Sequence, residues 1–130
     1  MRGHIHGKDS VYAASLFAEM VSVTNKSPSE LLNELKKEFG SFIMVEDDMR
    51  FDPEIKPVVQ KTLMIDKLLP TFKDEIIKVN YEDGCKVYFE DGFVICRFSG
   101  TEPLLRIFAE STNSVRAKEY IDTFKKFLFE

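Results

Sequence analysis

The stretch that decides the fold of this chain is CKVYFEDGFVICRF, residues 85–98. Its two halves are rich in β-branched, aromatic and other apolar residues, and they meet at Asp91-Gly92, a dipeptide that favours a tight hairpin turn. A second dipeptide of the same kind, Asp83-Gly84, comes directly before the first half. The stretch therefore predicts adjacent antiparallel strands, with a further strand entering through Asp83-Gly84.

The flanking sequence extends this pattern into a sheet with helices. The strand candidates in this half of the chain are residues 76–81, 85–89, 93–98 and 104–110. Residues 41–52 are also strand-like, and Pro53 opens a helical pattern that continues to Pro70. A final helix over about 113–129 has one apolar and one charged side. These elements predict an α+β fold, a four-stranded or five-stranded antiparallel sheet with helices on one face.

The first 40 residues have a different character. Residues 9–24 are apolar almost all round, as is typical of a helix between two layers. Ser27, Pro28 and Glu30 form a capping-box pattern for a second helix, and Gly40 is a candidate left-handed stop. Two helices are too little for a core of their own. We therefore expect residues 41–130 to form a domain and residues 1–40 not to form one alone.

Composition limits the classes of function. Of the 130 residues, 44% are hydrophobic, and 18 basic and 22 acidic residues give a net charge of −4. The charges are interleaved, without the basic stripe that follows a nucleic-acid backbone. No apolar run is long enough for a membrane span. We expect a soluble globular chain whose partners are neither nucleic acid nor membrane.

Cysteine usage and the first nine residues bear on location. Cys85 and Cys96 lie in strand-like runs without CxxC spacing, so we interpret them as small buried hydrophobes in a reducing compartment, with a disulfide as the alternative. Residues 1–9 lack the apolar stretch of a secretory signal. The expected location is cytoplasmic.

The segment RFSGTEP, residues 97–103 and here named the Arg97 loop, carries the most specific chemistry. The guanidinium of Arg97 is a planar fork of donors, the hydroxyls of Ser99 and Thr101 add donors, and Gly100 lets backbone N–H groups turn toward a ligand. This set suits a phosphate. The alternative is an ordinary turn between strands, in which the same groups satisfy backbone carbonyls.

With its flanking strands, the Arg97 loop resembles the phosphate-binding loop in domain 4, the C-terminal domain of the α-D-phosphohexomutases, the phosphoglucomutase/phosphomannomutase family. The resemblance covers nearly the whole chain. In that family an active-site phosphoserine donates a phosphoryl group to a hexose phosphate, and domain 4 holds the phosphate that is not being transferred. The resemblance implies that Arg97, Ser99, Gly100 and Thr101 bind that phosphate. Arg106 is a further candidate, for which pairing with Glu110 or Glu102 is the alternative.

A second segment, GHIHGKD over residues 3–9, resembles the part of domain 3 that follows the sugar-reading loop. His4 and Lys8 match the family's histidine and lysine, which implies a catalytic general acid/base role for Lys8 and a substrate contact for His4. The alternative is an exposed helix start capped by Asp9. A metal site at His4 and His6 is disfavoured because no third ligand has suitable spacing.

Other family segments have no counterpart here. The catalytic serine loop, the Mg²⁺ loop and the sugar-specificity loop are missing from these 130 residues, and residues 46–48 lack the Asp-x-Asp-x-Asp pattern. The resemblance thus implies that residues 1–40 are a helical remnant of domain 3 and residues 41–130 are domain 4. It also implies no cofactor bound by this chain and no phosphoryl transfer by it alone. The expected partners are phosphate or a hexose phosphate of glucose, mannose or glucosamine, and the remaining mutase domains. A free-standing phosphate-binding or regulatory module, and a structural domain that binds nothing, are the alternatives.

The apolar helix over residues 9–24 needs another element to bury its side chains. Its side chains would face water without the other elements of domain 3. We therefore expect a homodimer in which residues 9–39 of one chain pack against another chain.

Overall fold

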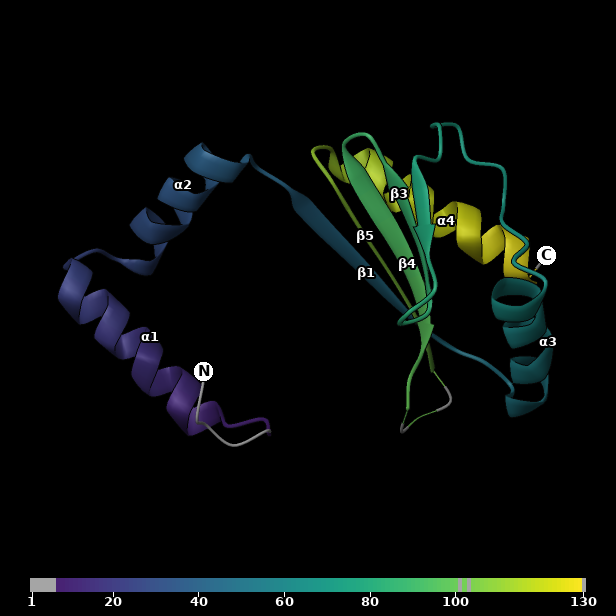
Figure 1. Ribbon diagram of the computed structural model, residues 1–130, viewed down its shortest axis with the longest axis horizontal. Coiled ribbons are helices and arrows are strands. Elements are labelled where there is room, and N and C mark those ends of the chain that lie inside the picture. The colour runs from purple at the N-terminus through teal and green to yellow at the C-terminus, as the bar shows by residue number, and fades with distance from the viewer. Residues whose placement is uncertain (1–6, 101, 103, 130) are drawn as a thin grey trace. The chain divides into compact units, whose positions relative to one another are not determined.

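The computed structural model describes residues 7–100, 102 and 104–129 (Figure 1). They divide into two compact units, residues 1–41 and residues 42–130. In the described part of the chain, no helix is long and apolar enough to cross a membrane.

The first unit consists of α1 (Ser10–Thr24) and α2 (Pro28–Phe39). Asp9 caps α1 by accepting a hydrogen bond from the backbone N–H of Tyr12 at 2.9 Å. The predicted capping box of α2 is confirmed, with Ser27 and Glu30 each accepting from the other's backbone N–H. α2 ends at Gly40 as predicted, and Gly40 has a positive φ of 91°. The predicted left-handed helical conformation is wrong, because its ψ is 168°. None of the residues of α1 or α2 is buried.

The second unit is built on a five-stranded sheet in the order β1-β5-β4-β3-β2 (Figure 1). Every neighbouring pair is antiparallel. The strands are β1 (Ile43–Arg50), β2 (Lys78–Asn80), β3 (Cys85–Phe89), β4 (Gly92–Phe98) and β5 (Leu104–Ser111). The α+β class is confirmed, and β1 joins the sheet beside β5 as the fifth strand.

One face of the sheet is covered by α4 (Ser114–Phe129). Along β3, β4 and β5 the register brings Val87, Val94 and Ala109 into line, and all three are fully buried. The helix places its own buried residues on the same core: Ala117, Tyr120, Ile121 and Phe124. Burying side chains of this size is worth about 1.5–3 kcal/mol each. The core therefore lies between α4 and one face of the sheet.

The helical segment after β1 is shorter than the sequence predicts. It comprises a 3₁₀ turn (Pro53–Ile55), α3 (Lys56–Gln60) and a π-helical turn (Lys61–Ile65), and no helix or strand follows until β2. The predicted continuation to Pro70 is wrong because Lys67 adopts a positive φ of 53°, which a right-handed helix does not accommodate. Val59 and Leu63 from this segment are buried in the same core as α4.

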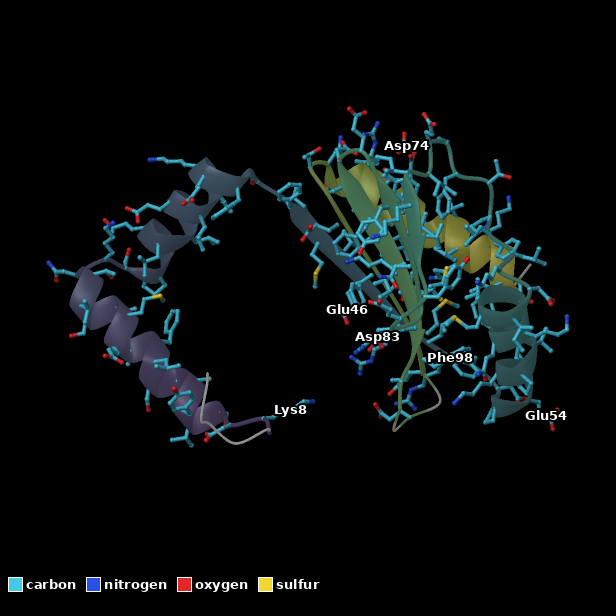
Figure 2. All side chains as sticks on the ribbon, viewed as in Figure 1. Lys8, Glu46, Glu54, Asp74, Asp83 and Phe98 are labelled. Carbon is cyan, nitrogen blue, oxygen red and sulfur yellow. The ribbon has the colours of Figure 1, made fainter. Side chains whose placement is uncertain are left out.

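Polar contacts join the segment between this helix and β2 to α4. Asp74, labelled in Figure 2, accepts a hydrogen bond from the Tyr120 hydroxyl at 2.5 Å and lies 3.3 Å from the Arg116 guanidinium. Arg116 also contacts Asp91 in the β3–β4 turn, at 2.7 Å. Burial, together with Asp74, raises the pKa of Tyr120, so the hydroxyl stays protonated and continues to donate.

The two cysteines are free and buried. They are register neighbours, Cys85 on β3 and Cys96 on β4. Burial raises the pKa of the Cys85 thiol to about 11 and that of Cys96 further. Both thiols therefore behave as small apolar groups of the core, as the sequence predicts.

Gly84 is a position at which the backbone requires glycine. Its φ is +88°, and a Cβ would lie 2.5 Å from the carbonyl oxygen of Cys96 and 2.6 Å from the Cβ of Arg97. Gly84→Ala is therefore expected to lower the free energy of unfolding by about 1–3 kcal/mol. Urea unfolding measures this loss. Gly100→Ala is the control, because a Cβ there would have no heavy atom of the described residues within 4 Å apart from its chain neighbours. Equal losses in the two variants would contradict the prediction.

Candidate functional site

Arg97 lies near the end of β4, on the sheet face opposite α4. Its neighbour Cys96 points into the core, and side chains alternate between the two faces of a strand. The Nη1 atom of Arg97 donates to Oδ2 of Asp83 at 2.8 Å. Figure 2 shows Asp83 and Phe98 at the same end of the sheet, where the loop between β4 and β5 emerges. The arginine is thus anchored by a regular strand and reaches the base of that loop.

The Arg97 loop closes tightly on itself. The backbone N–H of Ser99 donates to the carbonyl of Leu104 at 2.8 Å, and the N–H of Leu104 donates to the carbonyl of Glu102 at 2.8 Å. Beside Gly100 the described chain leaves open space. Thr101 lies outside the described residues. Ser99 and Gly100 therefore stand on a short connection whose ends are fixed by β4 and β5.

Arg106 is the register partner of Arg97 across β4 and β5. Like charges directly opposite one another destabilise a sheet, so this arrangement needs compensation. The acidic partner of Arg106 is Asp48 on β1, at 3.8 Å, in place of the Glu110 or Glu102 pairing that the sequence suggests. The difference arises because β1 joins the sheet next to β5 and brings Asp48 level with Arg106. Two guanidinium groups thus share one end of the exposed face.

The donors of Arg97 differ in accessibility. Its Nε is buried and has no hydrogen-bond partner among the described residues, while the side chain as a whole is 39% exposed. A ligand arriving from solvent therefore meets the Nη groups. One of these, Nη1, already donates to Asp83. The Nη groups retain donor capacity beyond this contact.

The residues predicted from the second segment lie elsewhere. Lys8 is exposed and comes just before α1. Asp9 caps this helix, which confirms the capped helix start that the sequence offers as the alternative. His4 lies outside the described residues. Lys8 belongs to the first unit and Arg97 to the second. The catalytic role of Lys8 and the roles of His4, Arg106 and the Arg97 loop stay predictions.

Sequence reasoning missed Asp83 as a member of the site. The signal was present, because a tight turn at Glu90-Asp91 pairs Cys85 with Cys96 and thereby brings the preceding Asp83-Gly84 dipeptide level with the end of β4. Within the described residues, no group of three or more His, Cys, Asp or Glu side chains is placed to hold a metal ion. The site is an arrangement of arginines, carboxylates and loop backbone.

Comparison with known proteins gives a consistent family. Residues 52–126 match the family model described as "Phosphoglucomutase/phosphomannomutase, C-terminal domain". A phosphoglucomutase/phosphomannomutase of Thermococcus kodakarensis is 31% identical over 126 residues, which cover 95% of this chain and 25% of that protein. A probable phosphoglucosamine mutase of Methanopyrus kandleri is 38% identical over 93 residues, 72% of this chain and 20% of that protein. The chain thus spans about a quarter or less of the length of these relatives.

A solved structure shows the same fold. It is a phosphoglucomutase/phosphomannomutase family protein from Burkholderia thailandensis, which superposes with a TM-score of 0.53 and 22% identity over 78% of this chain and 19% of that one. The resemblance stated from the sequence is therefore confirmed at the level of family and fold. The chain belongs to the phosphoglucomutase/phosphomannomutase family, and it carries the C-terminal domain of that family.

Proposed function

We propose that the Arg97 loop, through Arg97, Ser99, Gly100 and Thr101, binds the phosphate of a hexose phosphate that is not being transferred in a phosphohexomutase reaction. The observation that carries the proposal is the placement of Arg97 directly opposite Arg106 at the base of the loop. Two adjacent guanidinium groups on an exposed sheet face are unfavourable without an anion. A phosphate dianion would offset this repulsion better than the two separate carboxylates do.

The energetic role of such a site is positional. Charge-assisted hydrogen bonds to phosphate are worth about 1.5–3 kcal/mol each. Holding the remote phosphate lets this binding energy orient the reacting end of the sugar. Phosphoryl transfer itself needs an activated nucleophile and charge neutralisation. In our proposal the remaining domains of the mutase supply these groups, Lys8 assists as a general acid/base, and this chain binds neither Mg²⁺ nor another cofactor.

The cytoplasm is the compartment that we propose for this domain. Cys85 and Cys96 are free thiols on adjacent strands. Cysteines persist as thiols in compartments kept reducing by glutathione and thioredoxin. Hexose phosphates as substrates fit the same location.

Inorganic phosphate is expected to bind the 130-residue chain with a Kd near 1 mM, about 4 kcal/mol of binding free energy, because one loop supplies only part of a cleft. Titration followed by backbone amide NMR measures this, and the shifts should centre on residues 97–103. Arg97→Ala should abolish them, and Arg97→Lys should weaken binding because the fork is lost. Lys118→Ala, which removes an equal charge from exposed α4 surface, should leave them unchanged. Shifts confined to other residues would refute the proposal.

Gly100→Ala separates binding from folding. A Cβ at this position meets nothing in the described chain, so the free energy of unfolding should stay within about 0.5 kcal/mol of the parent. A phosphate approaching the loop backbone would meet that Cβ, so phosphate affinity should fall. Paired urea unfolding and phosphate titrations test both statements. Unchanged affinity in a stably folded variant would show that the ligand does not approach the backbone at Gly100.

We also propose that residues 9–39 associate with a second copy of the chain. A groove of about 390 Å³ on the first unit is lined largely by apolar side chains of α1 and α2, among them Phe17, Met20, Leu32 and Leu35. Phe17 is 50% exposed and Leu35 is 53% exposed, which is unusual for large apolar residues that share a groove. The hydrophobic effect favours burying such a surface against another molecule.

Sedimentation at low micromolar concentration is expected to give a dimer. Phe17→Glu should convert it to a monomer, because a carboxylate would be buried without a partner in the interface. Val115→Glu is the matched control, since Val115 is an exposed apolar residue of α4 in the second unit, and it should leave the dimer intact. A parent chain that sediments as a monomer would overturn this association.

A further inference from the structure

The contact between Asp83 and Arg97 sets a condition on phosphate binding. Asp83 lies in the turn between β2 and β3, and its Oδ2 accepts from Nη1 of Arg97 at 2.8 Å. Phosphate recognition by arginine works best when two parallel N–H donors meet two oxygens. The carboxylate of Asp83 thus occupies a donor of the side chain that the proposed function assigns to phosphate.

One of the two bidentate edges of this guanidinium is buried. An arginine offers either its Nε and one Nη, or its two Nη groups, as a pair of parallel donors. The Nε of Arg97 is buried, so the first edge is closed to an incoming anion. The second edge includes Nη1, which Asp83 holds. Nη1 keeps a second N–H, but a phosphate on the Nη1–Nη2 edge would share this nitrogen with the carboxylate of Asp83.

The fold holds the turn against Arg97 through Gly84. A Cβ at Gly84 would lie 2.6 Å from the Cβ of Arg97 and 3.0 Å from its Cα, so only glycine allows the turn to approach this closely. The approach places the preceding residue, Asp83, within reach of the guanidinium. Backbone packing thus keeps Asp83 and Arg97 close to each other.

We propose that Asp83 is an intramolecular competitor of phosphate at Arg97, and that phosphate binding displaces its carboxylate. This inference rests on the proposed function. Asp83 is 75% exposed and Arg97 is 39% exposed, so solvent screens their ion pair and makes its exchange for a dianion easy. A carboxylate left beside a bound phosphate would repel it. The competitor therefore lowers phosphate affinity and couples occupancy of the site to the position of the β2–β3 turn.

A positioning role for Asp83 is the opposite possibility. In that case the carboxylate would hold Arg97 ready while phosphate binds to the remaining donors. The shared edge disfavours it, because a phosphate on the Nη1–Nη2 edge would lie beside the carboxylate of Asp83 on the same guanidinium, and the two anions would repel each other. The two roles predict opposite signs for the effect of removing the carboxylate.

The test is a titration of the 130-residue chain with inorganic phosphate, followed by the amide signals of the Arg97 loop and of Asp83 and Gly84. Asp83→Asn and Asp83→Ala should tighten phosphate binding by up to about fivefold, the upper end of what an exposed ion pair is worth. Glu82→Gln is the matched control. It removes the same charge from the adjacent exposed residue, whose carboxylate contacts Asn80, and it should tighten binding less. In the parent chain, the Asp83 and Gly84 amides should shift with the same midpoint as the loop.

The outcomes separate this inference from the proposed function. If the parent chain binds phosphate at the loop and Asp83→Asn binds equally or more weakly, the proposed function stands and the competitor is refuted. An equal gain of phosphate affinity in Glu82→Gln would also refute the competitor, because the loss of any nearby negative charge would then explain the effect. If neither parent nor Asp83 variants bind phosphate at residues 97–103, both proposals fail. In an Arg97→Ala background, the Asp83 substitution should have no further effect on binding.

Discussion

The packing of α4 on one face of the sheet is the interaction on which the rest of the second unit depends. It buries Phe124 and Ile121 against strands whose inward residues, such as Ile107, are fully buried. Because side chains of a strand alternate between faces, this choice of inner face assigns every other residue to the outer face. A slip of one residue would exchange the two faces. The hydrophobic core thereby fixes which side of the sheet Arg97 and Arg106 occupy.

That assignment creates an electrostatic problem on the outer face. Arg97 and Arg106 are register partners, and each finds a carboxylate on a neighbouring element, Asp83 on the β2–β3 turn and Asp48 on β1. Both ion pairs are partly exposed and therefore weak. The two arginines therefore lie opposite each other although their ion pairs contribute little to the free energy of unfolding. An arrangement of this kind stays open to exchange with a stronger anion, which is the physical basis of both phosphate proposals.

The two units differ in how far they bury their apolar side chains. Residues 42–130 bury a contiguous core between a sheet and a helix, whereas the described residues of α1 and α2 bury none of their side chains. The helices of the first unit are instead specified locally, by the Asp9 cap and by the capping box of Ser27 and Glu30. Local capping fixes where a helix begins, but it does not cover an apolar face. The first unit therefore keeps an exposed apolar groove, which is the basis of the proposed association.

The sequence by itself determined the α+β class, the hairpin of β3 and β4, the capping of α2 and the family resemblance, because these depend on short-range patterns and motifs. It did not determine that the helix after Pro53 ends early, since apolar spacing alone does not reveal a positive φ at Lys67. It also did not give Arg106 its partner Asp48 or Arg97 its partner Asp83. Those pairs join residues of different elements, and only the tertiary pairing of β1 with β5 and the close approach of Gly84 to Arg97 bring their charges within reach.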